Sequence, residues 1–183
     1  TACKGIPYPS KTHPYRYGTS GCVYTSGCGM CVSLMALRNS TTRVFNTRQW
    51  THRCLGMGAR AAEGTDMAVV ARYMKEKYGL DYAVTTDMDR LLAHLKQGYK
   101  AIINVSGGGK MLFSNSGHYV LAAGIDKNGN LIILDPYWYD GKFTLTAARR
   151  KYTRVKNGRE VYVRPADLKG DVLSMWLFTP KRD

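Results

Sequence analysis

The sequence predicts an α+β protein in which helices come first and an antiparallel sheet follows. Two observations support this. Between residues 28 and 98, apolar residues recur at helical spacing. After Gly98 they occur in short runs rich in β-branched and aromatic residues, which are typical of strands. We expect a single domain over residues 1–183, with an extended arm over 1–27, a mainly helical part over 28–98 and a mainly antiparallel sheet over 99–183.

Four helices are expected from apolar periodicity and capping signals. The first covers residues 28–38, with Thr25 or Ser26 near its N-cap. Another is capped by Thr65 and ended by Gly79, because glycine readily adopts the left-handed conformation that terminates helices. The other two are a short helix over 46–55 and a helix from Asp87 to Gly98 that carries His94 on its polar face.

Five later segments have strand-like composition. They cover residues 101–105, 119–124, 131–134, 160–163 and 172–178. The glycine-rich loop at 106–110 lacks the spacing of a phosphate-binding loop, so we expect it to form a mobile rim rather than a nucleotide site.

The charge balance is strongly basic. The 183 residues include 27 Lys and Arg against 13 Asp and Glu, a formal net charge of +14. Such a field attracts polyanions: nucleic acid, anionic membranes or the teichoic polymers of bacterial walls. The densest basic run, residues 149–159, is either a binding strip or a solvated loop and strand pair. No segment approaches the ~20 apolar residues of a membrane span, so we expect none.

The cysteine count is odd, so the five thiols cannot all pair within the chain. Cys28 and Cys31 have half of a zinc-site spacing, but the second half is missing. The sequence does not fix whether disulfides form among Cys3, Cys22, Cys31 and Cys54.

Three separated segments carry reactive side chains. Cys28 opens an apolar, helix-forming stretch, and the N–H groups at a helix start favour the thiolate. His118 follows a Ser-Gly turn and opens a strand, where it can reach a helix end, and Asp135 ends the next strand. These are the parts of a thiol nucleophile, its base and the group that orients the base, so the pattern predicts cysteine-dependent amide-bond chemistry.

Each of these residues also has a plain structural interpretation. Cys28 suits a buried helix position, His118 a surface position, and Asp135 a strand-end turn before Pro136.

The hairpin register bears on the pairing of His118 with Asp135. A turn centred between residues 126 and 127 sets Asp135 directly opposite His118. A tight turn at 128–129 pairs Asp135 with Ala122 instead. The catalytic assignment requires the first, wider loop.

The same segments resemble the peptidase C39-like branch of the papain-like cysteine peptidases. The resemblance is carried by Ser26-Gly27-Cys28-Gly29, Gly117-His118-Tyr119-Val120-Leu121, Asn128-Gly129-Asn130 and Asp135-Pro136-Tyr137-Trp138, with Ile6-Pro7-Tyr8 early and Trp176-Leu177-Phe178 late. It implies a papain-like fold in which the catalytic helix packs on an antiparallel sheet. It also implies a triad of Cys28, His118 and Asp135 that cleaves peptide or isopeptide bonds. We further expect Gly27, Gly117 and Trp138 to bind substrate.

The chain departs from the family pattern around its oxyanion site. The usual Gly-Cys-Gly-Pro-Thr continues here with Met30 and Cys31. Lys11 replaces the usual glutamine of the N-terminal motif, and Cys22 stands where transporter-linked relatives keep their oxyanion-binding glutamine. The expected donors are therefore the backbone N–H of Cys28, assisted by Tyr24, Ser26 or a lysine such as Lys11.

Taken together, these features lead us to expect a cysteine endopeptidase without cofactor or metal. The expected substrate is the peptide of bacterial peptidoglycan, as for an endolysin or bacteriolytic domain located outside the cell or at the wall. Anionic wall polymers are candidate partners, and nucleic acid is not expected. Three alternatives stay open: an inactive wall-binding homologue, a zinc-stabilised nucleic-acid-binding module with Cys22, Cys28, Cys31 and Cys54 as ligands, and a peptidase acting on leader peptides or proteins.

Overall fold

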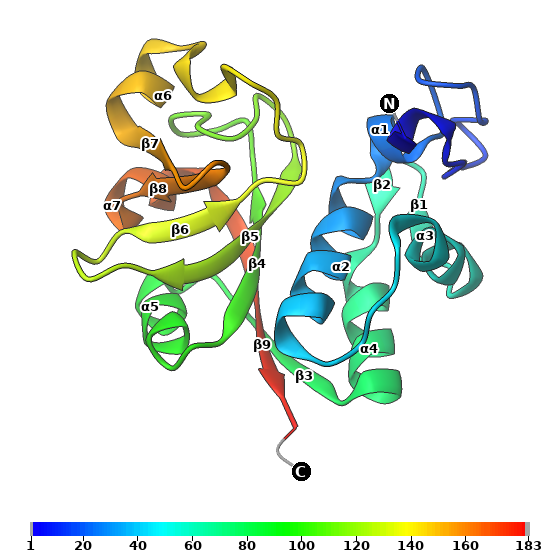
Figure 1. Ribbon diagram of the computed structural model, residues 1–183, viewed down its shortest axis with the longest axis horizontal. Helices are drawn as coiled ribbons and strands as arrows, with labels where there is room; N and C mark the ends of the chain where they lie inside the picture. The colour runs from blue at the N-terminus through cyan, green and yellow to red at the C-terminus, as the bar shows by residue number, and fades with distance from the viewer. Residues whose placement is uncertain (1, 182–183) are drawn as a thin grey trace. The chain divides into compact units, whose positions relative to one another are not determined.

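A computed structural model describes residues 2–181, and the chain divides into two compact units (Figure 1). The first unit comprises residues 1–81 and 180–183, and the second comprises residues 82–179. Helices dominate the first unit, and most of an antiparallel sheet lies in the second. The predicted combination of helices and antiparallel sheet is confirmed.

The first unit is built mainly from three helices, each longer than two turns. Its elements are η1 (Ala2–Gly5), α1 (Val23–Ser26), α2 (Cys28–Ser40), α3 (Thr47–Gly56), the short strands β1 (Arg60–Ala61) and β2 (Gly64–Thr65), and α4 (Met67–Tyr78). The segment before α2 is therefore not extended throughout, because it contains η1 and α1.

The first turn of α4 is capped by Asp66, so the expectation of Thr65 was wrong by one residue. The Asp66 carboxylate accepts hydrogen bonds from the N–H groups of Ala68 and Val69, at 3.1 and 3.4 Å. Thr65 is buried and its hydroxyl bonds the Tyr8 hydroxyl at 2.7 Å. Gly79 ends the helix as predicted, with a φ of 68°.

Helix α2 is fixed in the first unit by a buried tryptophan. The Trp50 indole N–H donates to the Ser33 hydroxyl at 2.9 Å, and that hydroxyl donates to the Met30 carbonyl at 2.7 Å. Phe45 stacks on the Trp50 ring, with the ring centroids 5.6 Å apart. Because Trp50 belongs to α3, these contacts hold α2 against its neighbour and fix its rotation about its own axis.

The second unit is organised around a seven-stranded sheet in the order β3-β9-β4-β5-β6-β8-β7. The segments from residue 80 onward are β3 (Leu80–Thr85), α5 (Met88–Lys96), β4 (Lys100–Val105), β5 (His118–Ile125), β6 (Leu131–Leu134), η2 (Lys142–Thr144), α6 (Ala147–Tyr152), β7 (Thr153–Lys156), β8 (Glu160–Val163), α7 (Pro165–Leu168), η3 (Lys169–Asp171) and β9 (Val172–Pro180). All five predicted strands are present. Strands β3 and β7 were not predicted.

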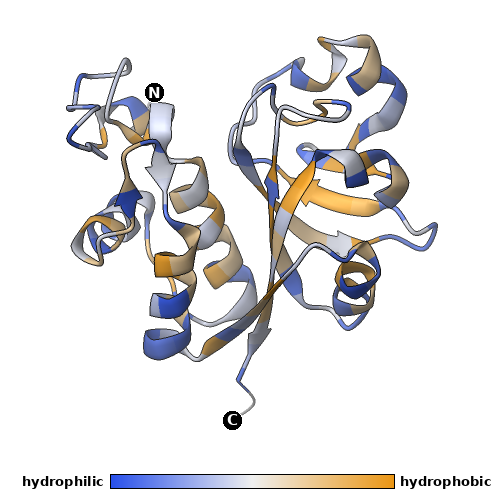
Figure 2. Ribbon diagram, turned by 180° about the vertical axis from the view of Figure 1, so that it is seen from behind, coloured by the Kyte–Doolittle hydropathy of each residue, from blue (hydrophilic) through white to orange (hydrophobic). Residues whose placement is uncertain are grey.

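Apolar side chains from the central strands, α5 and the later helices form the core of the second unit. Figure 2 shows the hydrophobic residues concentrated along these strands. Leu91 and Leu95 of α5 pack into this core. His94 is also buried, with its Nε2 2.9 Å from the Lys100 carbonyl, so its expected position on the polar face was wrong.

Neither predicted register of the β5–β6 hairpin is correct. The structure pairs Leu121 with Leu134, and a bulge between Ala122 and Gly124 shifts the register so that Ile125 pairs with Leu131. The turn is a three-residue loop in which the Gly129 N–H donates to the Asp126 carbonyl. The observed register lies between the two predicted ones on both sides of the bulge, which adds one residue to β5 only.

The loop between β4 and β5 is tied to η3, in contrast to the mobile rim that we expected. The Asp171 carboxylate accepts the N–H groups of Lys110 and Leu112 at 2.7 and 2.9 Å, and its backbone carbonyl accepts the N–H of Ser106 at 2.8 Å. Gly109 has a φ of 58°, and a Cβ there would collide with the Asp171 carboxylate. This loop leads directly into His118.

We predict that Asp171→Asn lowers the free energy of unfolding by about 1–3 kcal/mol, because its amide N–H₂ would face a buried backbone N–H. Urea unfolding followed by circular dichroism measures the change. Asp140→Asn, at an exposed acidic residue, is the control with the same loss of charge. Equal midpoints for the two variants would contradict the tether.

Candidate active site

Cys28 is the first residue of α2, a helix of 13 residues. The N-cap position belongs to Gly27, directly after Ser26, and no side chain caps the helix. The N–H groups of the first turn therefore keep their partial positive charge near the sulfur. The side chain is partly accessible. This is the type of setting in which a thiol ionises easily and acts as a nucleophile.

Glycine is required at position 27 because α1 ends directly against it. A Cβ on Gly27 would lie 2.5 Å from the Val23 carbonyl oxygen and 2.8 Å from its Cγ1. The Gly27 N–H donates to that same carbonyl at 2.9 Å, while its own carbonyl accepts from Cys31. The chain thus passes from α1 into α2 in a single residue, and this fixes where Cys28 begins the helix.

His118 and Asp135 are in direct contact in the second unit. His118 opens β5, opposite Val105 of β4, and Asp135 follows β6. The imidazole Nε2 lies 2.7 Å from the Asp135 Oδ1, and both side chains are buried, with 7% and 0% of their surface exposed. An ionised carboxylate can only accept, so Nε2 donates the proton. In the neutral ring, Nδ1 is then left as the nitrogen that can take a proton.

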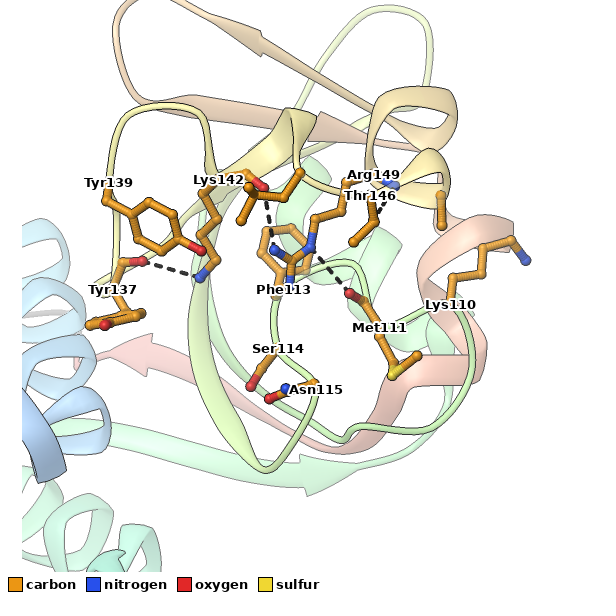
Figure 3. Close-up of a pocket in the computed structure, with 12 residues that line it drawn as sticks. Lys110, Met111, Phe113, Ser114, Asn115, Tyr137, Tyr139, Lys142, Thr146 and Arg149 are labelled. Carbon is orange, nitrogen blue, oxygen red and sulfur yellow. Dashed lines mark hydrogen bonds between the residues drawn. The ribbon is translucent and has the colours of Figure 1, made fainter.

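Asp135 has a second cationic partner that the sequence analysis did not anticipate. The Lys142 Nζ lies 2.6 Å from the Asp135 Oδ2 and is 3% exposed. The same ammonium donates to the Tyr137 carbonyl at 3.1 Å, and the Tyr137 and Tyr139 rings lie 5.3 and 5.8 Å from it (Figure 3). Tyr137 also donates its N–H to the Asp135 Oδ1 at 2.9 Å.

These contacts set the ionisation of Asp135. Burial acts to raise the pKa of the Asp135 carboxyl. The hydrogen bond and charge of His118 and the charge of Lys142 together lower it by more than burial raises it, so the pKa lies below its usual value. Asp135 is therefore an anion at neutral pH, as a group that orients an imidazole and stabilises its protonated form must be.

The family of the chain follows from a comparison with known proteins. Residues 4–161 match the model of the peptidase C39-like family. The chain belongs to this family. The prediction made from the sequence motifs is therefore confirmed, and the match spans both the segment around Cys28 and the segments around His118 and Asp135.

Two solved structures share the fold of this C39-like chain. One is the peptidase domain of Streptococcus ComA, a bifunctional ABC transporter involved in a quorum-sensing pathway. It has a TM-score of 0.54 and 15% identity over 84% of this chain and 91% of that chain. The other is a protein named as a candidate C39-like peptidase from Bacillus anthracis, with a TM-score of 0.54 and 11% identity over 86% of this chain and 90% of that chain. A search of curated proteins found no match.

The predicted oxyanion donors lie in the first unit. Tyr24 is exposed in α1, with the Lys4 ammonium 5.0 Å from its ring centroid. Lys11 is exposed in a loop that neighbouring residues fasten to the Ala62 carbonyl. Cys22 is buried at the N-cap of α1, and its sulfur contacts the Thr25 hydroxyl at 3.4 Å. Its position does not supply the amide donor of the transporter-linked relatives.

The predicted substrate-binding residues have different surroundings. Gly27 is buried at the helix junction described above. Gly117 is exposed just before His118, and a Cβ there would meet no atom within 4 Å. Trp138 is partly buried against the core of the second unit, with its ring 5.6 Å from that of Phe143. Much of the Trp138 surface is therefore covered by the core of the second unit.

Two of the other cysteines, Cys31 and Cys54, are poorly suited to nucleophilic chemistry. Burial raises the pKa of Cys31 and of Cys54 to about 12. Cys3, Cys22, Cys31 and Cys54 carry free thiols. Within residues 2–181, His, Cys, Asp and Glu form no group of three that could hold a metal ion. The zinc alternative therefore has no ligand set there.

We predict that Asp135→Asn lowers the free energy of unfolding by about 3–5 kcal/mol, because it leaves the Lys142 ammonium buried without its anion. Adding Lys142→Met to that variant is expected to restore at least about 1 kcal/mol, since a buried pair replaced as a whole costs little. Urea unfolding of the wild type, both single variants and the double variant measures the coupling. Additive effects would contradict the ion pair.

The same variants test the acid dependence. The folded-state pKa of Asp135 lies below its unfolded value of about 3.9, so its contribution is present above about pH 4 and is lost as the pH falls further. The stability gap between wild type and Asp135→Asn is therefore expected to shrink below pH 4. A constant gap from pH 7 to pH 3 would argue against an ionised Asp135.

Proposed function

We propose that this C39-like chain is a cysteine endopeptidase whose triad is Cys28, His118 and Asp135. The observation that supports it most is the buried 2.7 Å hydrogen bond from His118 to Asp135, in a family whose chemistry uses a cysteine nucleophile. Cys28 starts a helix and is partly accessible, which favours its thiolate.

In the acylation step, the Cys28 thiolate attacks the carbonyl carbon of the scissile amide and the carbonyl oxygen takes the negative charge. The backbone N–H of Cys28 donates to that oxygen, with Tyr24 or Lys11 as candidate additional donors. The His118 Nδ1 gives its proton to the amine as the C–N bond breaks. The amine leaves, and the acyl group remains on sulfur as a thioester.

In the deacylation step, the neutral His118 Nδ1 takes a proton from water and the resulting hydroxide attacks the thioester carbon. The C–S bond breaks and releases the carboxylic acid and the Cys28 thiolate. Asp135 keeps Nε2 as the donor nitrogen throughout, so Nδ1 is free to receive the proton and return it.

We propose peptidoglycan peptides as the substrate, in an enzyme that works outside the cell or at the wall. The support is electrostatic: the net charge of +14 favours retention on an anionic wall. Within residues 2–181, no helix is both long and apolar enough to cross a bilayer. Leader peptides, proteins and an inactive wall-binding role are the competing outcomes of the test below.

We predict that purified peptidoglycan incubated with the wild type gains free amino groups and releases peptide fragments measurable by mass spectrometry. Cys28→Ala is expected to lose this release by at least about 10³-fold, because removing a triad member leaves only binding and oxyanion stabilisation. Cys31→Ala, which removes a thiol with a raised pKa three residues later in the same helix, is the matched control and should keep its activity.

The two variants also separate the alternatives. Iodoacetamide should label Cys28 faster than any other cysteine. If the wild type is labelled at Cys28 but releases nothing from peptidoglycan, the substrate is instead a leader peptide or a protein. Equal activity of Cys28→Ala and the wild type would overturn the catalytic assignment.

A basic strip on the second unit is the proposed contact with anionic wall polymers. It comprises Lys151, Arg154, Lys156 and Arg164, which are all exposed and line one shallow pocket of about 290 Å³. Arg154 is held in place by hydrogen bonds to the Arg150 and Thr153 carbonyls at 2.8 and 2.7 Å. Arg164 is paired with Asp167, so most of the unbalanced charge comes from the other three residues.

We predict that replacing Lys151, Arg154 and Lys156 with glutamine weakens binding to intact walls and flattens its dependence on salt, because fewer counterions are released. Co-sedimentation with walls between 50 and 300 mM NaCl measures both effects. The control replaces three exposed cations elsewhere, Arg72, Lys77 and Lys96, with the same change in net charge. Equal losses in the two variants would show that net charge acts rather than the strip.

A further inference from the structure

A pocket of about 390 Å³ opens in the second unit next to the Asp135–Lys142 pair (Figure 3). One wall comes from the loop that precedes His118, another from Tyr137 and Tyr139, and a third from η2, α6 and the residues that join them. The lining contains three cations, Lys110, Lys142 and Arg149, and no acidic residue. Its volume is at the lower end of that of small-molecule pockets, which suits one or two amino-acid residues.

Arg149 is the unusual member of this lining. It is 8% exposed. Its Nε donates to the Met111 carbonyl at 3.3 Å and its Nη1 to the Lys142 carbonyl at 3.2 Å. Within residues 2–181, the remaining guanidinium nitrogen, Nη2, makes no hydrogen bond. It is not one of the buried side-chain nitrogens that lack both a partner and contact with solvent, so it is accessible from the pocket that Arg149 lines.

Among residues 2–181, the charge of Arg149 has no counter-ion. Among the described residues, the ion pairs involve other cations, and Arg149 bonds only to neutral carbonyls. The neighbouring cations are otherwise engaged: Lys142 with Asp135, and Lys110 over the Tyr152 ring at 4.9 Å. A buried charge is normally paired, because leaving it alone in a low-dielectric site is unfavourable. The pocket therefore has an excess positive charge that a bound anion would neutralise.

We propose that Arg149 binds a carboxylate of the peptide substrate in this pocket, which makes it a specificity residue of the proposed peptidase. A guanidinium N–H₂ group donates well to a carboxylate oxygen. Phe113, Leu145 and Ala148 in the lining suit the aliphatic part of an amino acid. Lys142 links the pocket to Asp135 and thus to His118, so the recognised carboxylate belongs to a residue near the scissile bond.

A carboxylate fits this pocket better than a polymer phosphate does. The pocket is built from a buried arginine and apolar walls, whereas the exposed cations gather on the separate basic strip. A repeating polyanion needs such an open row of charges, while a single carboxylate needs one directed donor.

The test measures binding by the inactive variant Cys28→Ala, so that cleavage is not required. Soluble muropeptides are prepared from peptidoglycan with a muramidase, and half are amidated at their carboxylates with carbodiimide and ammonium. Titration calorimetry is expected to show at least about 10-fold weaker binding of the amidated set, because amidation removes one hydrogen bond between charged groups. Adding Arg149→Met should remove this preference.

A second pair of variants protects the test against misfolding, since Arg149 also holds two backbone carbonyls. Leu145→Glu places a negative charge in the pocket lining at an exposed position and should weaken binding of the free-carboxylate set only. Leu173→Glu, at an exposed leucine outside the lining, should change neither affinity. Muropeptides trimmed of their terminal residue distinguish a C-terminal carboxylate from a side-chain carboxylate.

Equal affinity for the free and amidated sets, or an unchanged preference in both Arg149→Met and Leu145→Glu, would overturn this assignment. So would competition by soluble poly(glycerol phosphate) that disappears in Arg149→Met, because the pocket would then bind a wall polymer. Failure of the peptidase proposal is separate: it would appear as wild type that binds muropeptides with the stated preference but cleaves nothing.

Discussion

A single buried carboxylate organises the chemistry of the second unit. The Asp135 oxygens accept from an imidazole, an ammonium and a backbone N–H at distances between 2.6 and 2.9 Å. A carboxylate satisfied in this way cannot rotate without breaking several charge-assisted bonds at once, so it fixes the plane of the His118 ring. It also balances the charge of Lys142 in a site with little solvent. Orientation of the His118 ring and stability of the fold therefore depend on the same group.

The connection extends from the imidazole to the pocket lining. Arg149 holds the Lys142 backbone, Lys142 holds Asp135, and Asp135 holds His118. Each contact is between buried groups, where electrostatic interactions are strong. A substrate group that binds Arg149 would thus contact a side chain three contacts removed from His118.

The first unit selects one cysteine from five by local environment. Helix α2 places Cys28 at its N-terminus, where backbone dipoles favour the anion, and Trp50 fixes the helix through Ser33. Cys31, three residues later, is surrounded by protein and keeps its proton, with a pKa of about 12. We therefore expect the two thiols to differ in reactivity because of their positions along the helix axis.

Much of this arrangement could be predicted from the sequence because it follows from short-range rules. Apolar runs rich in β-branched and aromatic residues at 119–124 and 131–134 predicted neighbouring strands, and that was enough to bring His118 near Asp135. The predicted registers were wrong because they assumed other turns than the one that forms, and because an apolar pattern does not reveal a bulge. Lys142 and Arg149 were missed for a related reason: long cations in a polar segment are usually solvated, and only tertiary packing shows that these two are buried.

The two loops that flank β5 differ in how firmly they are built into the fold. The turn after β5 is closed by its own Asp126 side chain, which accepts from Asn128 and Asn130 and involves no distant element. The loop before β5 is hydrogen-bonded to the Asp171 carboxylate of η3, some sixty positions further along the chain. We therefore expect extra sequence, such as an affinity tag or a fused binding module, to be tolerated between Lys127 and Asn128. The same graft between Gly108 and Lys110 would displace the strand that carries the imidazole.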